Sequence, residues 1–377
     1  ALNEKISALL KAESISLSGG GVVPGAKPNS PREDVYRLES YILHYQPDFI
    51  LTVGGGSAID SVKAANVLAC LGKEITPEID NYFGTGVVSE GLKKSGKRLR
   101  PLAVLQTSAS SGSHLTKYSN VTDMQAGQKK IIVDEAVVPA MPFFDYALTA
   151  TMPLGLTIDG ALDTISHTFE VFCGAGGDTY DKTARIAETA IDLVVANVKT
   201  LLKDPQNLEA REAIGLASDL GAYAIMIGGT SGAHLTSFSL VDIVAHGTAC
   251  GLMNPYYAVF YSRAIQKQLK VVGGVFRKHG YISRDLETLG GRDLALAVAE
   301  GMISFAASIG APVKLGDIKG FSENHVQRAL NAAKDPQLEM KLRNMPVPLT
   351  AADVDKYMEP ILRAAASGDM SLIKEFN

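Results

Sequence analysis

Four residues in the second half of the chain combine a carboxylate with imidazoles at spacings that suit a divalent metal. Asp163 and His167 lie four positions apart in "GLTIDGALDTISHTFEVF", which on a helix places both side chains on one face. His234 in "GGTSGAHLTSFSL" and His246 in "VDIVAHGTACGLMNPYY" lie in apolar segments, where a neutral imidazole needs a partner. A hydrogen-bonded core histidine would explain either one alone. Together the four residues predict a divalent metal site with a position open for substrate.

The other histidines of the chain lie in less informative contexts. His44 and His279 stand in polar segments at helix ends, and His325 is expected on an exposed helix, so we predict surface roles for all three. His114 follows a serine-rich loop and could face a cleft.

A glycine-rich turn in the first half suits close approach by an anion. In "LTVGGGSAIDSVKAA" an apolar strand-like run leads through Gly54–Ser57 into a helix-like run. Glycines lack Cβ, so a pyrophosphate can reach the backbone N–H groups at the positive end of the following helix. A tight strand-to-helix turn without a ligand remains the alternative.

A second polar loop follows the strand-like run "PLAVLQT". Its hydroxyls surround Gly112 and come from Thr107, Ser108, Ser110, Ser111 and Ser113. Such a loop at the carboxyl edge of a parallel sheet suits phosphate, ribose or a nicotinamide amide. A solvated serine-rich loop is the alternative, but two such loops on one sheet favour binding.

The elements that position these residues divide the chain in two. Residues 1–151 alternate helices (4–12, 33–45, 58–69) with strands (15–18, 48–53, 101–107, 129–138), which predicts a parallel sheet covered on both faces. Residues 152–377 carry long helix-periodic runs, such as 183–202 and 294–310, and are expected to be all helical. The prediction is an α/β nucleotide-binding domain followed by an all-α domain.

Composition bounds the possible partners. A length of 377 residues, 46% hydrophobic and 20% charged, suits about two globular domains. Net charge −4 offers no basic surface for nucleic acid or an anionic membrane. The three dispersed cysteines, Cys70, Cys173 and Cys250, argue against a disulfide framework or a thiolate zinc site and suit a reducing cytoplasm. No apolar run predicts a membrane span, and "ALNEKISALLKAES" resembles an amphipathic helix rather than a signal peptide.

Taken together, the motifs resemble the group III metal-dependent (iron-containing) alcohol dehydrogenase family. The resemblance runs from about Val22 to the end and is carried by "GGGSAID", "TSASSGSHLT", "KKIIVD", "MPLGLTIDGALDTISHTFE" and "AHGTACGLMNPYY". It implies a Rossmann-like first domain within a dehydroquinate synthase-like architecture, and a cytoplasmic homo-oligomer, a dimer. It also implies a strand and a further helical turn before the segment resembling "EKISALL", so we expect either that this strand is missing or that this member is trimmed.

The same resemblance implies roles for individual residues. Gly55, Gly56 and Ser57 would contact the pyrophosphate of NAD or NADP, and Asp60 would lie at the cleft on the next helix. Thr107, Ser108 and Ser111 would line the path of the dinucleotide, and Lys129 matches the family's cofactor-contacting lysine. The metal ligands, and thus the catalytic residues, would be Asp163, His167, His234 and His246.

The activity that the resemblance implies is hydride transfer between a nicotinamide and an alcohol or aldehyde whose oxygen coordinates the metal. Iron, Fe2+, is the family's metal, while carboxylate and imidazole donors without a thiolate suit Zn2+ as well. Alternative relatives are maleylacetate reductase-like or glycerol dehydrogenase-like enzymes and a synthase-like lyase. Retention of Asp163 with three histidines argues against a metal-independent or differently reacting relative such as a maleylacetate reductase. The absence of clustered Lys and Arg for a phosphorylated substrate argues against the lyase. A non-enzymatic nucleotide-binding module is the remaining class.

Three positions depart from the family pattern. His114 replaces the usual Glu after the serine-rich loop, Phe238 replaces a second histidine near the substrate, and twelve rather than fourteen positions separate His234 from His246. These departures leave the substrate unassigned.

Cofactor choice is expected to depend on Gly20. The family often has Asp at this strand end, where a carboxylate binds the adenosine ribose and repels a 2′-phosphate. Gly20 in "SLSGGGVVPGAKPNSP" removes that repulsion, which favours NADP(H) without excluding NAD(H). Lys27, in an apparent insertion "GAK", could reach the phosphate or remain a solvated loop cation.

Replacing Gly20 by Asp should therefore weaken NADPH binding by about 1 to 3 kcal/mol, the scale of a close, partly exposed charge pair, while NADH binding holds or improves. Fluorescence titration of both cofactors measures the two affinities. Identical titrations for the wild type and Gly20→Asp would show that this position does not discriminate.

Overall fold

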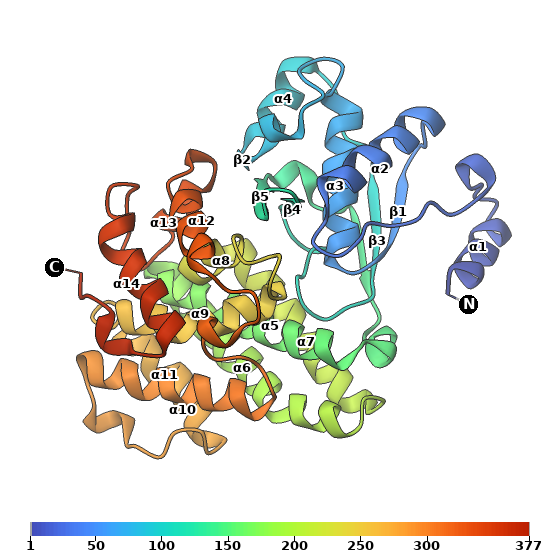
Figure 1. Cartoon of the computed structure of the whole chain (residues 1–377). Coiled ribbons are helices and arrows are strands. Elements are labelled where there is room, and N and C mark those ends of the chain that lie inside the picture. Colours follow the sequence, from blue (N-terminus) through green and yellow to red (C-terminus); the bar gives the residue numbers. More distant parts are fainter. Residues whose placement is uncertain (1, 377) are drawn as a thin grey trace.

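The computed structural model describes residues 2–376, and within them every strand lies before residue 145. Figure 1 shows the two parts side by side, the sheets and their helices in blue to cyan and the helical part in green to red. The strands are β1 (Ile50–Gly54), β2 (Gly84–Thr85), β3 (Leu102–Gln106), β4 (Tyr118–Asp123), β5 (Gln128–Val133) and β6 (Met141–Phe144). The helices among and before them are α1 (Leu2–Ala12), α2 (Arg32–Tyr45), α3 (Gly56–Leu71) and α4 (Val87–Ser95).

The second part is built from helices, as the sequence predicts. They are α5 (Leu154–Gly174), α6 (Tyr180–Lys203), α7 (Leu208–Ile227), α8 (Gly232–Ser237), α9 (His246–Phe260), α10 (Gln266–Lys278), α11 (Gly291–Ser308), α12 (Glu323–Ala333), α13 (Glu339–Arg343) and α14 (Val354–Ser367). The helix-periodic runs 183–202 and 294–310 become α6 and α11. Among the described residues, no helix combines the length and the apolar character needed to cross a membrane.

The first sheet is parallel, with the strand order β1-β3-β6. The strands predicted at 48–53 and 101–107 are therefore confirmed as β1 and β3, which pair from Ile50 opposite Leu102 to Gly54 opposite Gln106. Because both strands end at the same edge, the loops that follow them begin next to each other.

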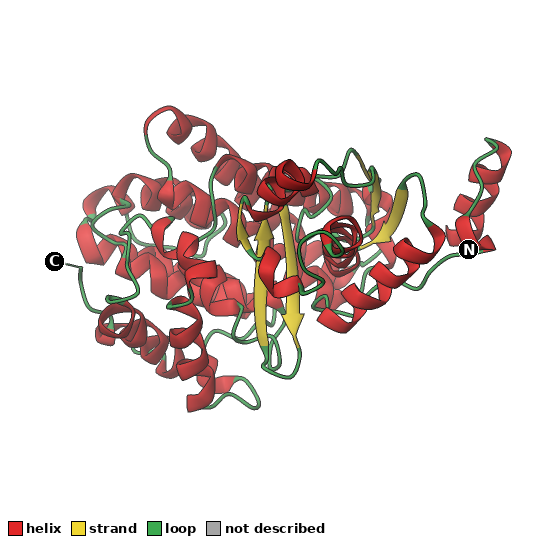
Figure 2. Cartoon of the chain, turned by 90° about the horizontal axis from the view of Figure 1, so that it is seen from above, coloured by secondary structure: helices red, strands yellow, loops and turns green. Residues whose placement is uncertain are grey.

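The strand predicted at residues 15–18 is wrong. Ser18–Gly20 forms a 3-10 turn instead, with φ of 72° at Gly19 and 73° at Gly20, and Ile15 and Leu17 are exposed. Left-handed glycines turn the chain out of an extended path, which apolar alternation in the sequence does not reveal. The preceding helix α1 forms as predicted but stands at the outer end of the molecule, as Figure 2 shows.

The run predicted at 129–138 does form a strand, but not in the parallel sheet, which corrects that expectation. β5 pairs antiparallel with β4 and parallel with the short β2 in a second sheet. We expected the segment that forms β4 to belong to the polar loop that follows β3. The hairpin closes through Gly127, whose φ of 64° suits glycine.

Strand β5 separates two hydrophobic cores. Ile131 and Val133 belong to the core of the helical part, whereas Ile132 belongs to the core formed by α2, α3, β1 and β3. Successive side chains of a strand point to opposite faces, so one strand serves both cores. This arrangement holds the two parts together beside the loops that follow β1 and β3.

Two buried charges on α3 fix the serine-rich loop after β3. Lys63 donates from Nζ to the backbone oxygens of Ser113, Thr116 and Tyr118 at 2.6, 2.7 and 2.8 Å. Asp60 accepts hydrogen bonds from Ser113 Oγ at 2.7 Å and from the backbone N–H of Asn120 at 2.9 Å. Buried charged groups are stable only with such partners, so the sequence of α3 determines the course of this loop.

Candidate active site

The glycine-rich turn and the serine-rich loop pack directly against each other. A Cβ atom at Gly55 would lie 2.7 Å from Ser108 Oγ, and one at Gly56 would collide with Ser111. The backbone N–H of Thr107 also donates to Gly54 O at 3.0 Å. Glycine is required here because the neighbouring loop occupies the space of a side chain.

The N-terminus of α3 remains available to a ligand. The first N–H groups of a helix have no intrahelical acceptor. Because α3 begins at Gly56 without a side-chain cap, no capping side chain occupies these groups. Ser57 Oγ accepts the backbone N–H of Asn29 at 3.0 Å and can still donate its own proton. The arrangement suits a phosphate at the positive end of a 16-residue helix.

The other predicted cofactor residues differ in their placement. Ser108 is buried beside Gly55, while Thr107 and Ser111 are half-buried. Asp60 is 3% exposed and occupied by internal hydrogen bonds, which makes it a positioning residue in this structure. Gly20 lies in the 3-10 turn Ser18–Gly20, with open space where a Cβ would stand.

Lys129 lies between the two predicted sites. Its backbone N–H donates to Phe238 O at 2.9 Å, and Nζ lies 5.9 Å from the centre of the Phe238 ring. Burial lowers the pKa of Lys129, and the opposing effects include those of Asp60 and Asp163. One cation is therefore coupled both to the dinucleotide side and to the predicted metal ligands.

The structure brings all four predicted metal ligands together around one carboxylate oxygen. Asp163 Oδ1 lies 3.5 Å from His167 Nε2, 3.6 Å from His234 Nε2 and 3.8 Å from His246 Nε2. Asp163 and His167 come from α5, whereas His234 comes from α8 and His246 from the first residue of α9.

Close packing of glycines makes this convergence possible. A Cβ at Gly247 would collide with α5 at Asp159, and one at Gly160 would collide with Ala109 in the serine-rich loop. The start of α9 and the loop can therefore both approach α5 closely. As a result, Ser110 Oγ donates to Asp163 Oδ2 at 2.9 Å and joins the loop to the ligand cluster.

Three buried atoms in the cluster lack hydrogen-bond partners, of which His167 Nδ1 is one. Asp163 Oδ1 and His234 Nε2 are both unpaired, and their residues are only 1% and 3% exposed. Leaving such groups unpaired is costly, and a divalent cation between them would satisfy both. The orphaned atoms and the oxygen and nitrogen donors therefore fit the metal that the sequence predicts.

Electrostatics favour the ligating forms of three of the residues. Burial alone would raise the pKa of Asp163, but the neighbouring imidazoles of His167, His234 and His246 outweigh it and hold that pKa well below its usual range. Burial lowers the pKa of His167 to about 4 and that of His246 well below its ordinary value. At neutral pH the carboxylate is ionised and these two imidazoles are neutral, as metal binding requires.

Sequence reasoning missed Glu170, which orients His234. Glu170 Oε1 lies 2.6 Å from His234 Nδ1, and Oε2 accepts the backbone N–H of Ser231 at 2.7 Å. The carboxylate fixes the ring so that Nε2 faces the cluster. Burial lowers the pKa of His234, but the negative groups around it, Glu170 and Asp163 among them, raise it well above its ordinary value, so a metal ion would have to displace the Nε2 proton. The signal was present, because Glu170 follows Asp163 by seven positions on the same helical face.

A second carboxylate, Asp159, lies one turn before Asp163 and was also missed. Its Oδ1 accepts hydrogen bonds from the backbone N–H of Thr248 at 2.7 Å and from Thr248 Oγ1 at 3.0 Å. Burial first, and then the charge of Asp163, raise the pKa of Asp159 to about 6. Asp159 anchors the first turn of α9 and hence the backbone that carries His246.

The remaining histidines lie outside the ligand cluster. His325, expected on an exposed helix, is 7% exposed because it caps α12: its Nδ1 accepts the backbone N–H of Ser322 at 3.1 Å. That expectation was wrong, since capping draws the ring against the chain. His114 is buried with Nε2 3.1 Å from Asp219 Oδ1, whereas His44 is exposed and His279 is half-buried against Asp192.

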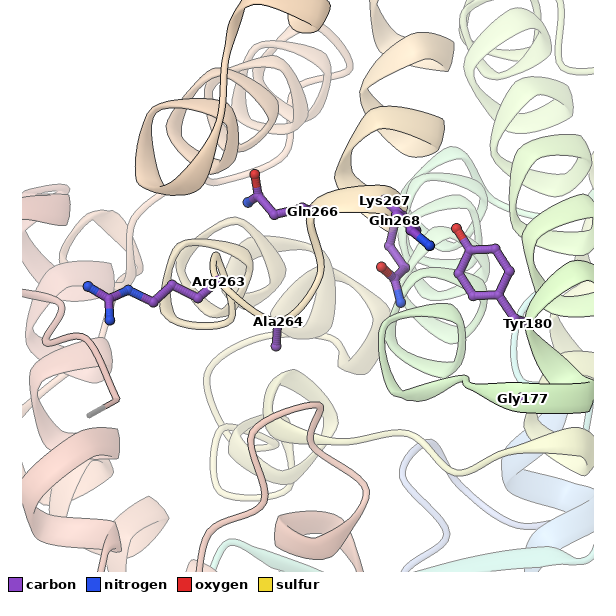
Figure 3. Close-up of a pocket in the computed structure, with 7 residues that line it drawn as sticks. All are labelled: Gly177, Tyr180, Arg263, Ala264, Gln266, Lys267 and Gln268. Carbon is purple, nitrogen blue, oxygen red and sulfur yellow. The ribbon is translucent and has the colours of Figure 1, made fainter.

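A surface groove of about 460 Å³ is formed by the connection between α9 and α10, the first residues of α10 and the start of α6. Figure 3 shows the residues that line it. Its lining includes Tyr180, Arg263 and Lys267 but none of the predicted site residues, and Arg263 is paired with Glu375. The groove therefore contributes nothing to the chemistry described above.

Fold and site together define a two-part protein in which an anion-binding turn lies beside a nitrogen and oxygen cluster suited to a divalent metal. The sequence model described as "Iron-containing alcohol dehydrogenase" matches residues 2–146, and that described as "Fe-containing alcohol dehydrogenase family, C-terminal" matches residues 157–362. The chain belongs to the iron-containing alcohol dehydrogenase family.

Curated relatives include the NAD-dependent methanol dehydrogenase of Bacillus methanolicus, 24% identical over 69% of this chain and 64% of that protein. The sulfoacetaldehyde reductase of Bilophila wadsworthia is 29% identical over 61% of this chain and 57% of that protein. The chain thus spans less than two thirds of the length of these two relatives.

Solved structures cover more of the fold. An alcohol dehydrogenase from Oenococcus oeni has a TM-score of 0.79 at 22% identity, covering 96% of this chain and 87% of that one. A sulfoacetaldehyde reductase from Bifidobacterium kashiwanohense in complex with NAD+ has a TM-score of 0.68 at 25% identity, covering 97% and 88%. The predicted architecture is confirmed.

Replacing Glu170 by Gln should reduce metal affinity about 10- to 100-fold, the usual cost of losing a carboxylate behind a ligating histidine. The amide has only one acceptor oxygen, whereas Nδ1 of His234 and the backbone N–H of Ser231 each need an acceptor. Competition with a chromophoric chelator measures the affinity, and Glu188→Gln on the exposed face of α6 is the matched control. Equal affinities for the two variants would contradict the orienting role.

Proposed function

We propose that this protein is an NAD(P)-dependent, metal-dependent alcohol dehydrogenase or aldehyde reductase, an oxidoreductase that acts on CH–OH groups. The observation that carries the proposal is the hydrogen bond from Ser110 to Asp163, which joins the loop beside the phosphate-binding turn to the buried ligand cluster. Hydride transfer needs the nicotinamide and the substrate carbon at near contact, and a direct hydrogen bond between the serine-rich loop and the ligand cluster supports such an arrangement.

The ligands that we propose for the metal are Asp163, His167, His234 and His246. Family membership favours Fe2+, and the mixed nitrogen and oxygen donors also suit Zn2+. The chemistry that a divalent ion supplies at such a site is stabilisation of negative charge on the substrate oxygen. The chain's own contribution is to hold the donors in place: Ser110 fixes one oxygen of Asp163, and Glu170 fixes His234.

NAD or NADP is the proposed cofactor. The backbone of Gly55 and Gly56 with the Ser57 hydroxyl would hold the pyrophosphate, and the hydroxyls of Thr107, Ser108 and Ser111 would line the path towards the nicotinamide. The Bifidobacterium neighbour bound to NAD+ supports the choice of dinucleotide. Lys129 would contribute positive charge near the junction, and Asp60 would act through Ser113. Gly20 remains the proposed position that distinguishes the two cofactors, because the absence of a carboxylate there would remove the repulsion of the 2′-phosphate of NADP.

A small alcohol or aldehyde is the proposed substrate class. The relatives' printed activities, on methanol, sulfoacetaldehyde and 1,3-propanediol, support small substrates without selecting one. The fully buried Phe238 ring, 6.1 Å from the ring of His246, contributes an apolar wall beside the cluster.

We further propose that the chain divides into domains at residues 1–151 and 152–377. The gap between the matched ranges 2–146 and 157–362 supports this division. A cytoplasmic setting is supported by the free thiols of Cys70, Cys173 and Cys250. A homodimer is supported by the exposed Met141 and Phe143 on the edge strand β6, and no nucleic-acid partner is expected at net charge −4.

Replacing Asp163 by Ala should abolish metal binding and turnover while leaving NAD(P)H binding nearly unchanged, because the cofactor loops belong to the other part of the chain. Absorbance of NAD(P)H with a panel of small alcohols and aldehydes measures turnover, and elemental analysis measures the metal. Asp163→Asn preserves the shape of the side chain, and Asp181→Ala at an exposed site is the control. Normal turnover by metal-free Asp163→Ala would contradict the metal mechanism. If the wild type binds the cofactor but turns over no substrate, a non-enzymatic nucleotide-binding module would be favoured instead.

A further inference from the structure

The thiol of Cys250 lies at the ligand cluster although none of the proposed roles uses it. Cys250 follows His246 by one turn of α9, is 0% exposed, and has Sγ 4.0 Å from His246 Nδ1. Ligand atoms of Asp163, His234, His246 and Cys250 all lie within 4.8 Å of one another. The sequence led us to expect a site without a thiolate, because Cys250 has no CxxC partner.

Independent groups beside Cys250 point to a bound cation. Asp163 Oδ1 and His234 Nε2 are buried without hydrogen-bond partners, and both residues belong to the set that includes the thiol. His167 is not in that set, although its Nε2 lies 3.5 Å from the same carboxylate oxygen. A cation placed to satisfy the two orphaned atoms would therefore also lie close to sulfur.

Resting on the proposed metal-dependent function, we propose that Cys250 Sγ is a further metal ligand, which makes this a mixed nitrogen, oxygen and sulfur site. Ligation replaces the S–H bond with a sulfur–metal bond and releases one proton to solvent, and no electron is transferred. Sulfur is softer than the other donors, so it raises the preference for Zn2+ over harder divalent ions. It also places a redox-sensitive atom at the site.

The position of Cys250 gives the sulfur a defined geometry. It shares a face of α9 with His246 at the i, i+4 spacing, and that helix is buried and anchored to Asp159 through Thr248. A thiol held this firmly needs no backbone movement to reach the cluster.

Cobalt substitution of the full chain tests the proposal, because Co2+ reports its ligands spectroscopically. We expect the Co2+-loaded protein to show visible d–d bands together with a near-ultraviolet charge-transfer band from thiolate. Cys250→Ser and Cys250→Ala should lose the charge-transfer band while the d–d bands remain. Their affinity for Zn2+ should fall at least about tenfold, since losing even an indirect partner costs this much. Cys70→Ser, on α3 in the other part of the chain, is the matched control and should retain the band.

The outcomes separate this inference from the proposed function. Visible d–d bands that Asp163→Ala abolishes, without a charge-transfer band in the wild type, would leave the metal site standing and overturn the role of Cys250. A charge-transfer band that persists in Cys250→Ser would overturn it as well. Failure of the wild type to bind Co2+, Zn2+ or Fe2+ would overturn the metal-dependent function itself.

Discussion

The buried carboxylate of Asp163 is the group on which the rest of the site depends. An ionised carboxylate at 1% exposure is unfavourable unless every lone pair has a partner. Ser110 satisfies one oxygen, and three imidazoles surround the other within 3.8 Å without hydrogen bonding to it. The helical part thus supplies an incomplete cage that a divalent ion would complete, and the α/β part supplies the hydroxyl that orients it.

The connection between the two parts has its own physical basis. β5 contributes side chains to both hydrophobic cores, so the serine-rich loop is held against α5 by packing as well as by hydrogen bonds. Lys63 and Asp60 fix the same loop from the side of α3, and glycine at positions 55, 56 and 160 allows the close approaches. The serine-rich loop and the proposed metal ligands are therefore held in one arrangement by packing and hydrogen bonds, which favours a reaction that depends on alignment.

Much of this could be predicted from sequence because the informative spacings are local. The turn Gly54–Ser57 and the pair Asp163 and His167 each lie within one element, where periodicity fixes which side chains share a face. Contacts between elements could not be read in the same way. The apolar run that forms β5 would have the same sequence pattern in a parallel or in a mixed sheet. The strand expected at 15–18 does not form, and the left-handed backbone conformation of Gly19 and Gly20 that turns the chain there is not visible in the apolar pattern. Glu170 lies seven positions after Asp163 and Cys250 four positions after His246, so each shares a helical face with a predicted ligand. Their importance depends on where α8 and α9 pack, which local spacing does not show.

Anomalous X-ray diffraction from crystals of the metal-loaded protein, collected at the absorption edge of the metal, tests the central claim most directly. The account predicts a single strong peak per chain in the space between Asp163 Oδ1 and His234 Nε2, with His167 and His246 facing it. A strong peak elsewhere in the chain, with these two atoms hydrogen-bonded to water or to each other, would contradict it.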